Sequence, residues 1–200
     1  MRPESKAEAA SAVKAATIPQ SPPGVYRSRD LEALFRATFF QSHDTVLEGG
    51  AAEPLYRPGS PHRIVYSHDY FRSALHEIAH WCVAGARRRQ LEDYGYWYAP
   101  DGRDAAQQAE FARVEVYPQA LEALFCAACG HGFRVSLDNL SGDGGDEQGF
   151  ALAVYQRAKA SLDGGLAERP RRWCQALAAH YGRRDITLKR ALDEIFQNPL

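Results

Sequence analysis

The residues of this chain best suited to chemistry are two histidines four positions apart, with a glutamate beside the first. They form the pattern H-E-x-x-H, made by His76, Glu77 and His80. Four residues of an α-helix return the chain to nearly the same face, so His76 and His80 can present two imidazoles to one metal ion. The structural alternative is that both are ordinary core or surface residues of a helix.

A helix from Tyr70 to Arg89 is expected to position these histidines. The segment contains no proline, and its one glycine, Gly85, lies near the end. Apolar residues recur at steps of three and four and define one buried face. Arginines at positions 87–89 suit the negative end of the helix dipole. His68, just before the helix, is a candidate capping residue or a further ligand.

A metal site needs a third protein ligand, and Glu115 is the first choice. It lies between Val114 and Val116, in a segment otherwise suited to burial. A carboxylate that is buried must be paired, hydrogen-bonded or bound to metal. Glu122 is the second choice in the same segment. A salt-bridged or helix-terminal glutamate is the structural alternative.

Two chemistries use two histidines and a carboxylate. With zinc, and with Glu77 as the general base, H-E-x-x-H on a helix supports peptide hydrolysis. With ferrous iron, the same types of ligand leave positions open for dioxygen and substrate, and support oxygenation. The motif by itself favours the hydrolase, because H-E-x-x-H is its familiar signature.

Composition and charge limit the classes of protein to which the chain can belong. Its 200 residues suit one domain, and a net charge of −1 argues against a general nucleic-acid binder. No apolar run approaches the roughly 18 residues of a membrane span, and the first residues lack the apolar part of a secretory signal. We therefore expect a cytoplasmic protein with reduced cysteines. Cys126 and Cys129 form a lone C-x-x-C, which we interpret as two buried helical residues rather than a redox pair or zinc knuckle.

The remaining elements are predicted from apolar periodicity and from proline and glycine. Residues 1–24, rich in alanine, serine and proline, are expected to form a mobile tail before a single domain at 25–200. Predicted helices cover residues 28–41, 104–112, 118–129, 150–162, 169–181 and 188–196, the third of them continuing or restarting near Pro118. Predicted strands cover residues 45–47, 63–67 and 133–140, and predicted loops cover 53–61 and 142–149.

An aromatic and polar stretch at residues 93–104 is either a cover over the core or a wall of an active site. Tyr96 lies among its aromatic residues, and a Pro-Asp-Gly turn signal follows them. In the second interpretation Asp101, Arg103 and Asp104 are polar groups for a substrate. The two interpretations are left open.

Several blocks of the sequence, taken in order, resemble the bacterial elongation factor P hydroxylase family. The blocks are HEIAHWC at 76–82, YGYWYAPDGRD at 94–104, VEVYPQALE at 114–122, FRVSLDNL at 133–140 and ERP at 168–170. The resemblance runs from about Arg27 to Tyr181, and both ends of the chain fall outside it. The chain departs from the family pattern at Tyr117, where we expect lysine, and at Cys129, where we expect a small residue.

The resemblance implies both a fold and an activity. The implied fold is α+β: a small mixed sheet packed with several helices, similar to a metal-dependent endoribonuclease fold, with the metal site on a central helix. The implied activity is hydroxylation of the β-lysylated lysine of elongation factor P, with Fe(II) and molecular oxygen, although zinc or another divalent metal can occupy the site in isolated protein. By matching motif, His76, His80 and Glu115 hold the iron, and Glu77 orients or hydrogen-bonds beside them.

Three alternatives remain, each with a distinguishing observation. A zinc peptidase should lose cleavage but keep its metal in the Glu77→Gln variant. A metal-dependent ribonuclease should cut RNA without oxygen, although the near-zero net charge disfavours it. A non-catalytic binding protein for elongation factor P should bind it equally well after all three ligands are changed to alanine. For the hydroxylase, a carboxylate such as Asp101 or Asp138 would receive the cationic side chain of the substrate.

Overall fold

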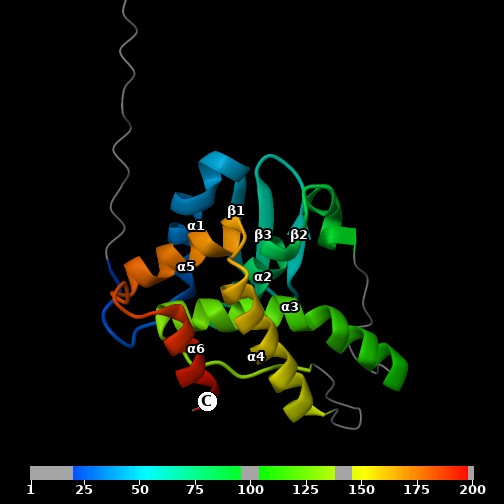
Figure 1. The fold of residues 1–200 in the computed structure, drawn as a ribbon. Coiled ribbons are helices and arrows are strands. Elements are labelled where there is room, and N and C mark those ends of the chain that lie inside the picture. Colours follow the sequence, from blue (N-terminus) through cyan, green and yellow to red (C-terminus); the bar gives the residue numbers. More distant parts are fainter. Residues whose placement is uncertain (1–19, 96–103, 138–145, 198–200) are drawn as a thin grey trace, which may run out of the picture.

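The computed structural model describes residues 20–95, 104–137 and 146–197. In these ranges the fold is α+β, with six α-helices and one small sheet (Figure 1). The elements are α1 (Ser28–His43), β1 (Thr45–Ala51), β2 (Leu55–Arg57), β3 (His62–Ser67), α2 (Phe71–Val83), η1 (Arg88–Gln90), η2 (Glu92–Gly95), α3 (Ala105–Cys129), α4 (Glu147–Asp163), α5 (Glu168–His180) and α6 (Leu188–Gln197).

The sheet has three strands in the order β1-β3-β2, with β1 parallel and β2 antiparallel to β3. It is therefore a mixed sheet, as the family resemblance implied. The register of β1 against β3 shifts between Glu48 and Ala51. Gly49 lies at this shift because the ring of Tyr66 leaves no room for a side chain: an added Cβ would lie 2.4 Å from it.

The longest helix, α3, runs across the middle of the molecule (Figure 1) and contacts α2, α4, α5 and α6. A capping box begins it: the Asp104 carboxylate accepts from the Gln107 backbone N–H, and the Gln107 side chain accepts from the Asp104 N–H. The helix continues through Pro118, and Gly130 ends it in the left-handed conformation at φ 81°. A single helix therefore carries both candidates for the third metal ligand.

The helix that carries the two histidines, α2, packs against β3 and α3. Its apolar face is buried as the periodicity predicted. Trp81 meets Phe35 and Phe39 of α1 edge to face, with ring centroids 5.2 and 4.9 Å apart. This face fixes the rotation of α2, and so decides that the stripe carrying the histidines turns toward α3.

The predicted C-terminal end of α2 is wrong. The helix ends at Val83 rather than Arg89, because Ala84 takes an extended backbone with φ −62° and ψ 120°. The carbonyl of Ala84 accepts from Arg89 Nη1 and Arg169 Nη2, each at 2.7 Å. Arginines therefore do cap this helix end, but one of them comes from the distant helix α5.

Two other predicted elements differ from the structure. Residues 55–57, within the predicted loop 53–61, form β2 and pair with β3. Residues 133–137, the described part of the predicted strand 133–140, form no strand. Their alternating pattern is satisfied instead by docking on α3, where the Gln119 side chain makes two hydrogen bonds to the backbone of Ser136.

The start of the chain and the surface add two observations. Gln20 and Ser21, within the predicted tail 1–24, hydrogen-bond to Ala179 O and His180 Nε2, so the chain already contacts α5 there. Residues 1–19 lie outside the described ranges.

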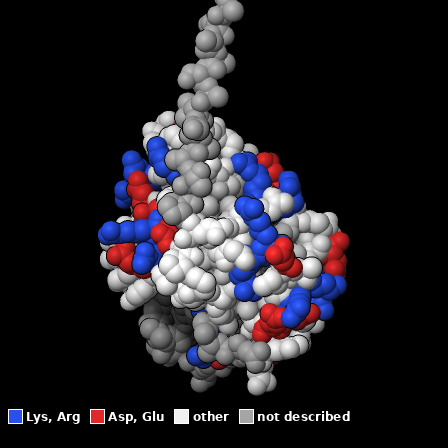
Figure 2. Space-filling view, turned by 90° about the vertical axis from the view of Figure 1, so that its left-hand side faces the viewer, with Lys and Arg blue, Asp and Glu red and all other residues white. Residues whose placement is uncertain are grey.

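None of the described helices is long and apolar enough to cross a membrane. On the face in Figure 2, positive and negative side chains are interspersed.

Candidate metal centre

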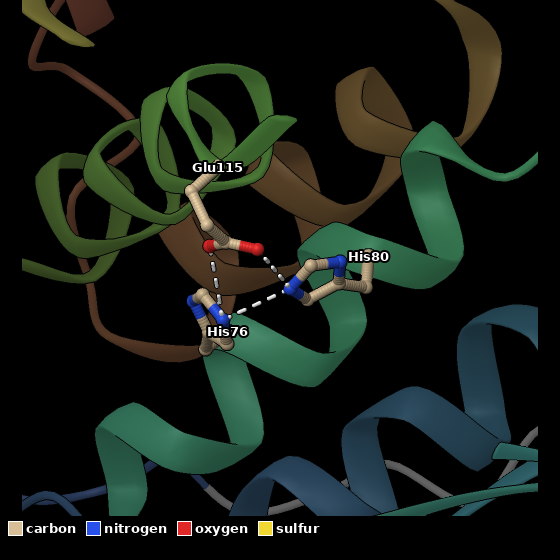
Figure 3. Close-up of side chains that lie close together, drawn as sticks. All are labelled: His76, His80 and Glu115. Carbon is tan, nitrogen blue, oxygen red and sulfur yellow. Dashed lines mark hydrogen bonds and ion pairs between the residues drawn. The ribbon is translucent and has the colours of Figure 1, made fainter. Parts of the chain in front are cut away.

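Two side chains of α2 and one of α3 converge on a single point, as Figure 3 shows. The Nε2 atoms of His76 and His80 are 3.0 Å apart. Oε1 of Glu115 lies 3.3 Å from Nε2 of His80, and Oε2 lies 3.6 Å from Nε2 of His76. One ligand atom from each residue lies within 4.8 Å of the other two. Elsewhere in the described ranges, no other three His, Cys, Asp or Glu side chains converge in this way.

The three side chains differ in their access to solvent. The side chain of Glu115 is only 4% exposed, whereas those of His76 and His80 are 26% and 19% exposed. The carboxylate is therefore at the back of the site, against the interior, and the imidazoles are partly open. An ion held between them would have protein on one side and access for a further molecule on the other.

A buried carboxylate and an arginine hold His76 in place. Nδ1 of His76 lies 3.0 Å from Oε2 of Glu122. The other oxygen of Glu122 accepts from Arg72 Nε at 3.0 Å and Arg72 Nη2 at 2.7 Å. Because a carboxylate can only accept, the proton of the imidazole must lie on Nδ1. This arrangement directs Nε2 of His76 toward the other two side chains.

Glu115 has a support of its own. The Gln119 amide, one helical turn further along α3, donates to Oε2 of Glu115 at 3.4 Å and to the carbonyl of Ser136 at 2.7 Å. The Gln119 carbonyl oxygen accepts from the Ser136 N–H at 3.0 Å. Gln119 is itself buried, so its orientation is fixed and it holds the Glu115 carboxylate from behind.

The charges of the site are coupled. Burial raises the pKa of Glu115, but the adjacent His80 and His76 and the Gln119 amide outweigh it and lower this pKa to about 2. Burial lowers the pKa of His76, but the hydrogen bond that His76 donates to Glu122 and the charges of Glu115, Glu122 and Glu77 outweigh it and raise this pKa to about 10. In the metal-free protein this raised pKa favours protonated His76, whose positive charge offsets the negative charge of the neighbouring carboxylates.

These features fit a divalent metal ion. The site offers two Nε2 atoms and a carboxylate that is charged although buried, which is the donor set used by iron and zinc. The partner of His76 at Nδ1 is of the kind that metal-bound histidines have. A divalent ion would also replace the positive charge that a proton on His76 supplies. Glu122, the second choice for a ligand, contacts the far side of His76 instead of the converging atoms.

The other predicted site residues are not among the converging side chains or lie outside the described ranges. Glu77 lies on α2 between the two histidines, and its carboxylate is not among the converging atoms. Burial raises its pKa, which the charges of His80 and His76 lower in part. Asp104 is exposed and caps α3. Outside the described ranges lie Tyr96, Asp101, Arg103 and Asp138.

Arg72 and Gln119 were not among the residues predicted from the sequence, and Glu122, the second choice for a ligand, contacts Nδ1 of His76 instead. The spacing of these residues carried a signal. Arg72 lies four residues before His76 and therefore one turn earlier on the same stripe of α2. Gln119 and Glu122 follow Glu115 at four and seven residues, which makes one polar stripe on an otherwise apolar part of α3.

Other residues singled out from the sequence lie apart from this site. His68 takes a positive φ of 51° and stacks on Tyr70, and the start of α2 has no side-chain cap. Cys126 and Cys129 are free and buried, as predicted, and so are the other two cysteines. Tyr117 packs under the guanidinium of Arg157 of α4, 4.0 Å from its ring centroid. Its departure from the family pattern thus takes effect at the contact between α3 and α4.

Comparisons with known proteins point to one family. The family described as elongation factor P hydroxylase matches residues 34–191, well over half of the chain. The elongation factor P lysine hydroxylase of Haemophilus influenzae is 43% identical over 164 residues, which are 80% of this chain and 92% of that protein. Both are hydroxylases, so the zinc-peptidase hypothesis gains no support. The chain belongs to the elongation factor P hydroxylase family.

Proposed function

We propose that this protein uses ferrous iron and molecular oxygen to hydroxylate the β-lysylated lysine of elongation factor P, and that His76, His80 and Glu115 hold the iron. The observation that carries the proposal is the convergence of these three side chains, two from α2 and one from α3, in a member of this family. The name of the Haemophilus influenzae relative supplies the protein substrate and the lysine.

The choice of iron follows from the reaction. Hydroxylation with dioxygen places one oxygen atom in a C–H bond, and the second leaves as water with electrons from a reductant. Zinc has no accessible redox change and cannot take part in such a reaction. Ferrous iron held by two histidines and one carboxylate would supply the open coordination positions and the redox chemistry.

The side chains of the site would divide the work. Glu115, kept charged although buried, supplies negative charge that retains the ion, and Gln119 fixes its carboxylate. Glu122 orients His76 through Nδ1, which leaves its Nε2 on the side where the ion would bind. Glu77 would act beside the ligands, as a group that orients or hydrogen-bonds.

The substrate side of the site is proposed to include residues close to the start of α3. Tyr96, Asp101, Arg103 and Asp104 would line the pocket, and Asp101 or Asp138 would supply a carboxylate for the cationic lysyl side chain. The net charge of −1 suits a protein substrate better than a nucleic acid, and neither sign of charge dominates on the face shown in Figure 2. With four free cysteines and a substrate that serves translation, we place the reaction in the cytoplasm.

Mass spectrometry of elongation factor P tests this function. β-Lysylated factor is incubated in air with the iron-loaded protein and a reductant, in parallel with the His80→Ala variant and with a variant of an exposed ion pair, Arg190→Ala. We expect the mass of one oxygen atom to be gained with the wild type and Arg190→Ala, and not with His80→Ala. An unchanged mass with fully iron-loaded wild type, or an equal gain with His80→Ala, would contradict the proposal.

A further inference from the structure

The backbone just after α3 is held by two side chains that also hold the proposed ligands. We call residues 134–136 the anchor segment. Arg72 Nη2 donates to the carbonyl of Arg134 at 2.6 Å. Gln119 makes one bond to the Ser136 carbonyl and accepts one from the Ser136 N–H, at 2.7 and 3.0 Å. The anchor segment thus contacts α2 through Arg72 and α3 through Gln119.

Arg72 links the anchor segment to the Glu122 carboxylate, which in turn contacts His76. Its guanidinium bonds at once to the anchor segment and to Oε1 of Glu122, while Oε2 of Glu122 contacts Nδ1 of His76. The Glu122 side chain is only 4% exposed, so water cannot replace the arginine at low cost. Without Arg72, the buried carboxylate would have one fixed partner fewer and would be free to rotate away from His76.

Gln119 links the anchor segment to the Glu115 carboxylate. It is 2% exposed, and its amide divides its hydrogen bonds between the Glu115 carboxylate and the backbone of Ser136. If the anchor segment shifts, the amide must turn with Ser136 or lose two hydrogen bonds. In either case the contact to Glu115 changes, because the donor is the same NH₂ group.

We propose that Arg72 and Gln119 are positioning residues that tie the metal ligands to the anchor segment, so that metal affinity depends on contacts made outside the coordination shell. The inference rests on the metal centre of the proposed function and deepens it. Coupling between two events is reciprocal, so metal binding must in return stabilise the anchor segment. Changing the partners of metal ligands typically costs 10- to 100-fold in affinity.

Cobalt(II) binding by the metal-depleted full chain tests the proposal without any turnover. The test variant is Arg72→Met, and the matched control is Arg172→Met. The two arginine side chains are equally exposed, at 31% and 30%, and each bonds to a carboxylate and to a backbone carbonyl and lies over a phenylalanine ring. The hydrogen bonds of Arg172 go to Thr38, Ser42 and Glu168, away from the ligands.

We expect Arg72→Met to weaken cobalt binding about 10- to 100-fold, and Arg172→Met to leave it within about twofold of the wild type. At saturating cobalt, the visible spectrum of Arg72→Met should keep the wild-type bands, because no ligand is removed. Hydrogen exchange of the Ser136 amide should slow when cobalt binds to the wild type. If Arg72→Met does not fold, Glu122→Gln keeps the side-chain size and should weaken binding by at least about tenfold for the same reason.

Two results overturn the inference. One is a dissociation constant within twofold of the wild type for the folded Arg72→Met or Glu122→Gln variant. The other is a Ser136 amide that exchanges equally fast with and without cobalt. A wild type that binds no cobalt at all removes the metal centre, and with it the proposed function. Tight binding by the wild type together with an unaffected Arg72→Met overturns only the positioning roles.

Discussion

Replacing Glu115 by glutamine is predicted to destabilise the metal-free protein. The pKa of Glu115 is about 2 against an ordinary value of 4.5, because its histidine neighbours outweigh the effect of burial. One pKa unit corresponds to about 1.4 kcal/mol, so the charged form contributes on the order of 3 kcal/mol to the free energy of unfolding at pH 7. Glutamine has the same shape but no charge, and loses this contribution.

The stability difference between the metal-free wild type and Glu115→Gln should depend on pH, and the direction follows from the lowered pKa of Glu115. A carboxyl whose pKa is lower in the folded state stabilises the protein above its unfolded pKa, and the stabilisation is lost as the pH falls through its folded pKa. For Glu115 this window runs from about 4.5 down to about 2. The stability difference between the wild type and Glu115→Gln should therefore be largest near neutral pH and should shrink through this window.

Urea unfolding of chelator-treated protein at several pH values between 3 and 7 measures the difference. A suitable control is Glu110→Gln, which changes an exposed carboxylate of α3 paired with Arg113, and should have no measurable effect. Cobalt at a hundredfold excess over its dissociation constant should add about 2.7 kcal/mol to the wild type and little to Glu115→Gln. A metal-free Glu115→Gln as stable as the wild type at pH 7 would refute the charge balance derived for the site.

Three further predictions concern other parts of the chain. Gly49→Ala should lower the free energy of unfolding by about 1–3 kcal/mol, because the added Cβ would overlap the ring of Tyr66. The control Gly85→Ala should not show this loss, because a Cβ there meets no other atom, and equal urea midpoints for the two variants would contradict the prediction. Burial raises the pKa of the Cys129 thiol to about 12, so alkylation by iodoacetamide at pH 8 should be slow in the folded protein and fast in denaturant; rapid labelling of the folded protein would show that the thiol is accessible. Glu77→Gln should keep its iron, measured by metal analysis, since Glu77 is outside the converging atoms. Loss of the iron would show that Glu77 takes part in holding it.

The three converging residues could be predicted because each rested on a local argument. His76 and His80 follow from helical periodicity, which depends only on spacing. Glu115 follows from the cost of burying a carboxylate between two valines. The role of Glu122 could not be predicted, because it depends on which side of α3 faces α2 and on which residues of the two helices lie opposite each other. That is decided by tertiary packing, such as the contact of Trp81 with α1.

The errors in the predicted fold have the same origin. The alternating residues 133–137 satisfy a strand pattern, but the partners of their backbone are side chains of α2 and α3 rather than another strand. Residues 55–57 lie between prolines and glycines, yet their pairing with β3 makes them a strand. The end of α2 at Val83 is fixed in part by Arg169, which lies far along the chain. In each case a long-range contact prevails over the local pattern.

The most direct test of the central claim is the position of iron in the protein. Crystals grown without oxygen in the presence of Fe(II) can be measured at the iron absorption edge, where anomalous scattering locates the ion. We predict a single strong peak at coordination distance from Nε2 of His76, Nε2 of His80 and a carboxylate oxygen of Glu115. A peak at another place, or an ion held by Glu122 while Glu115 turns away, would contradict the account.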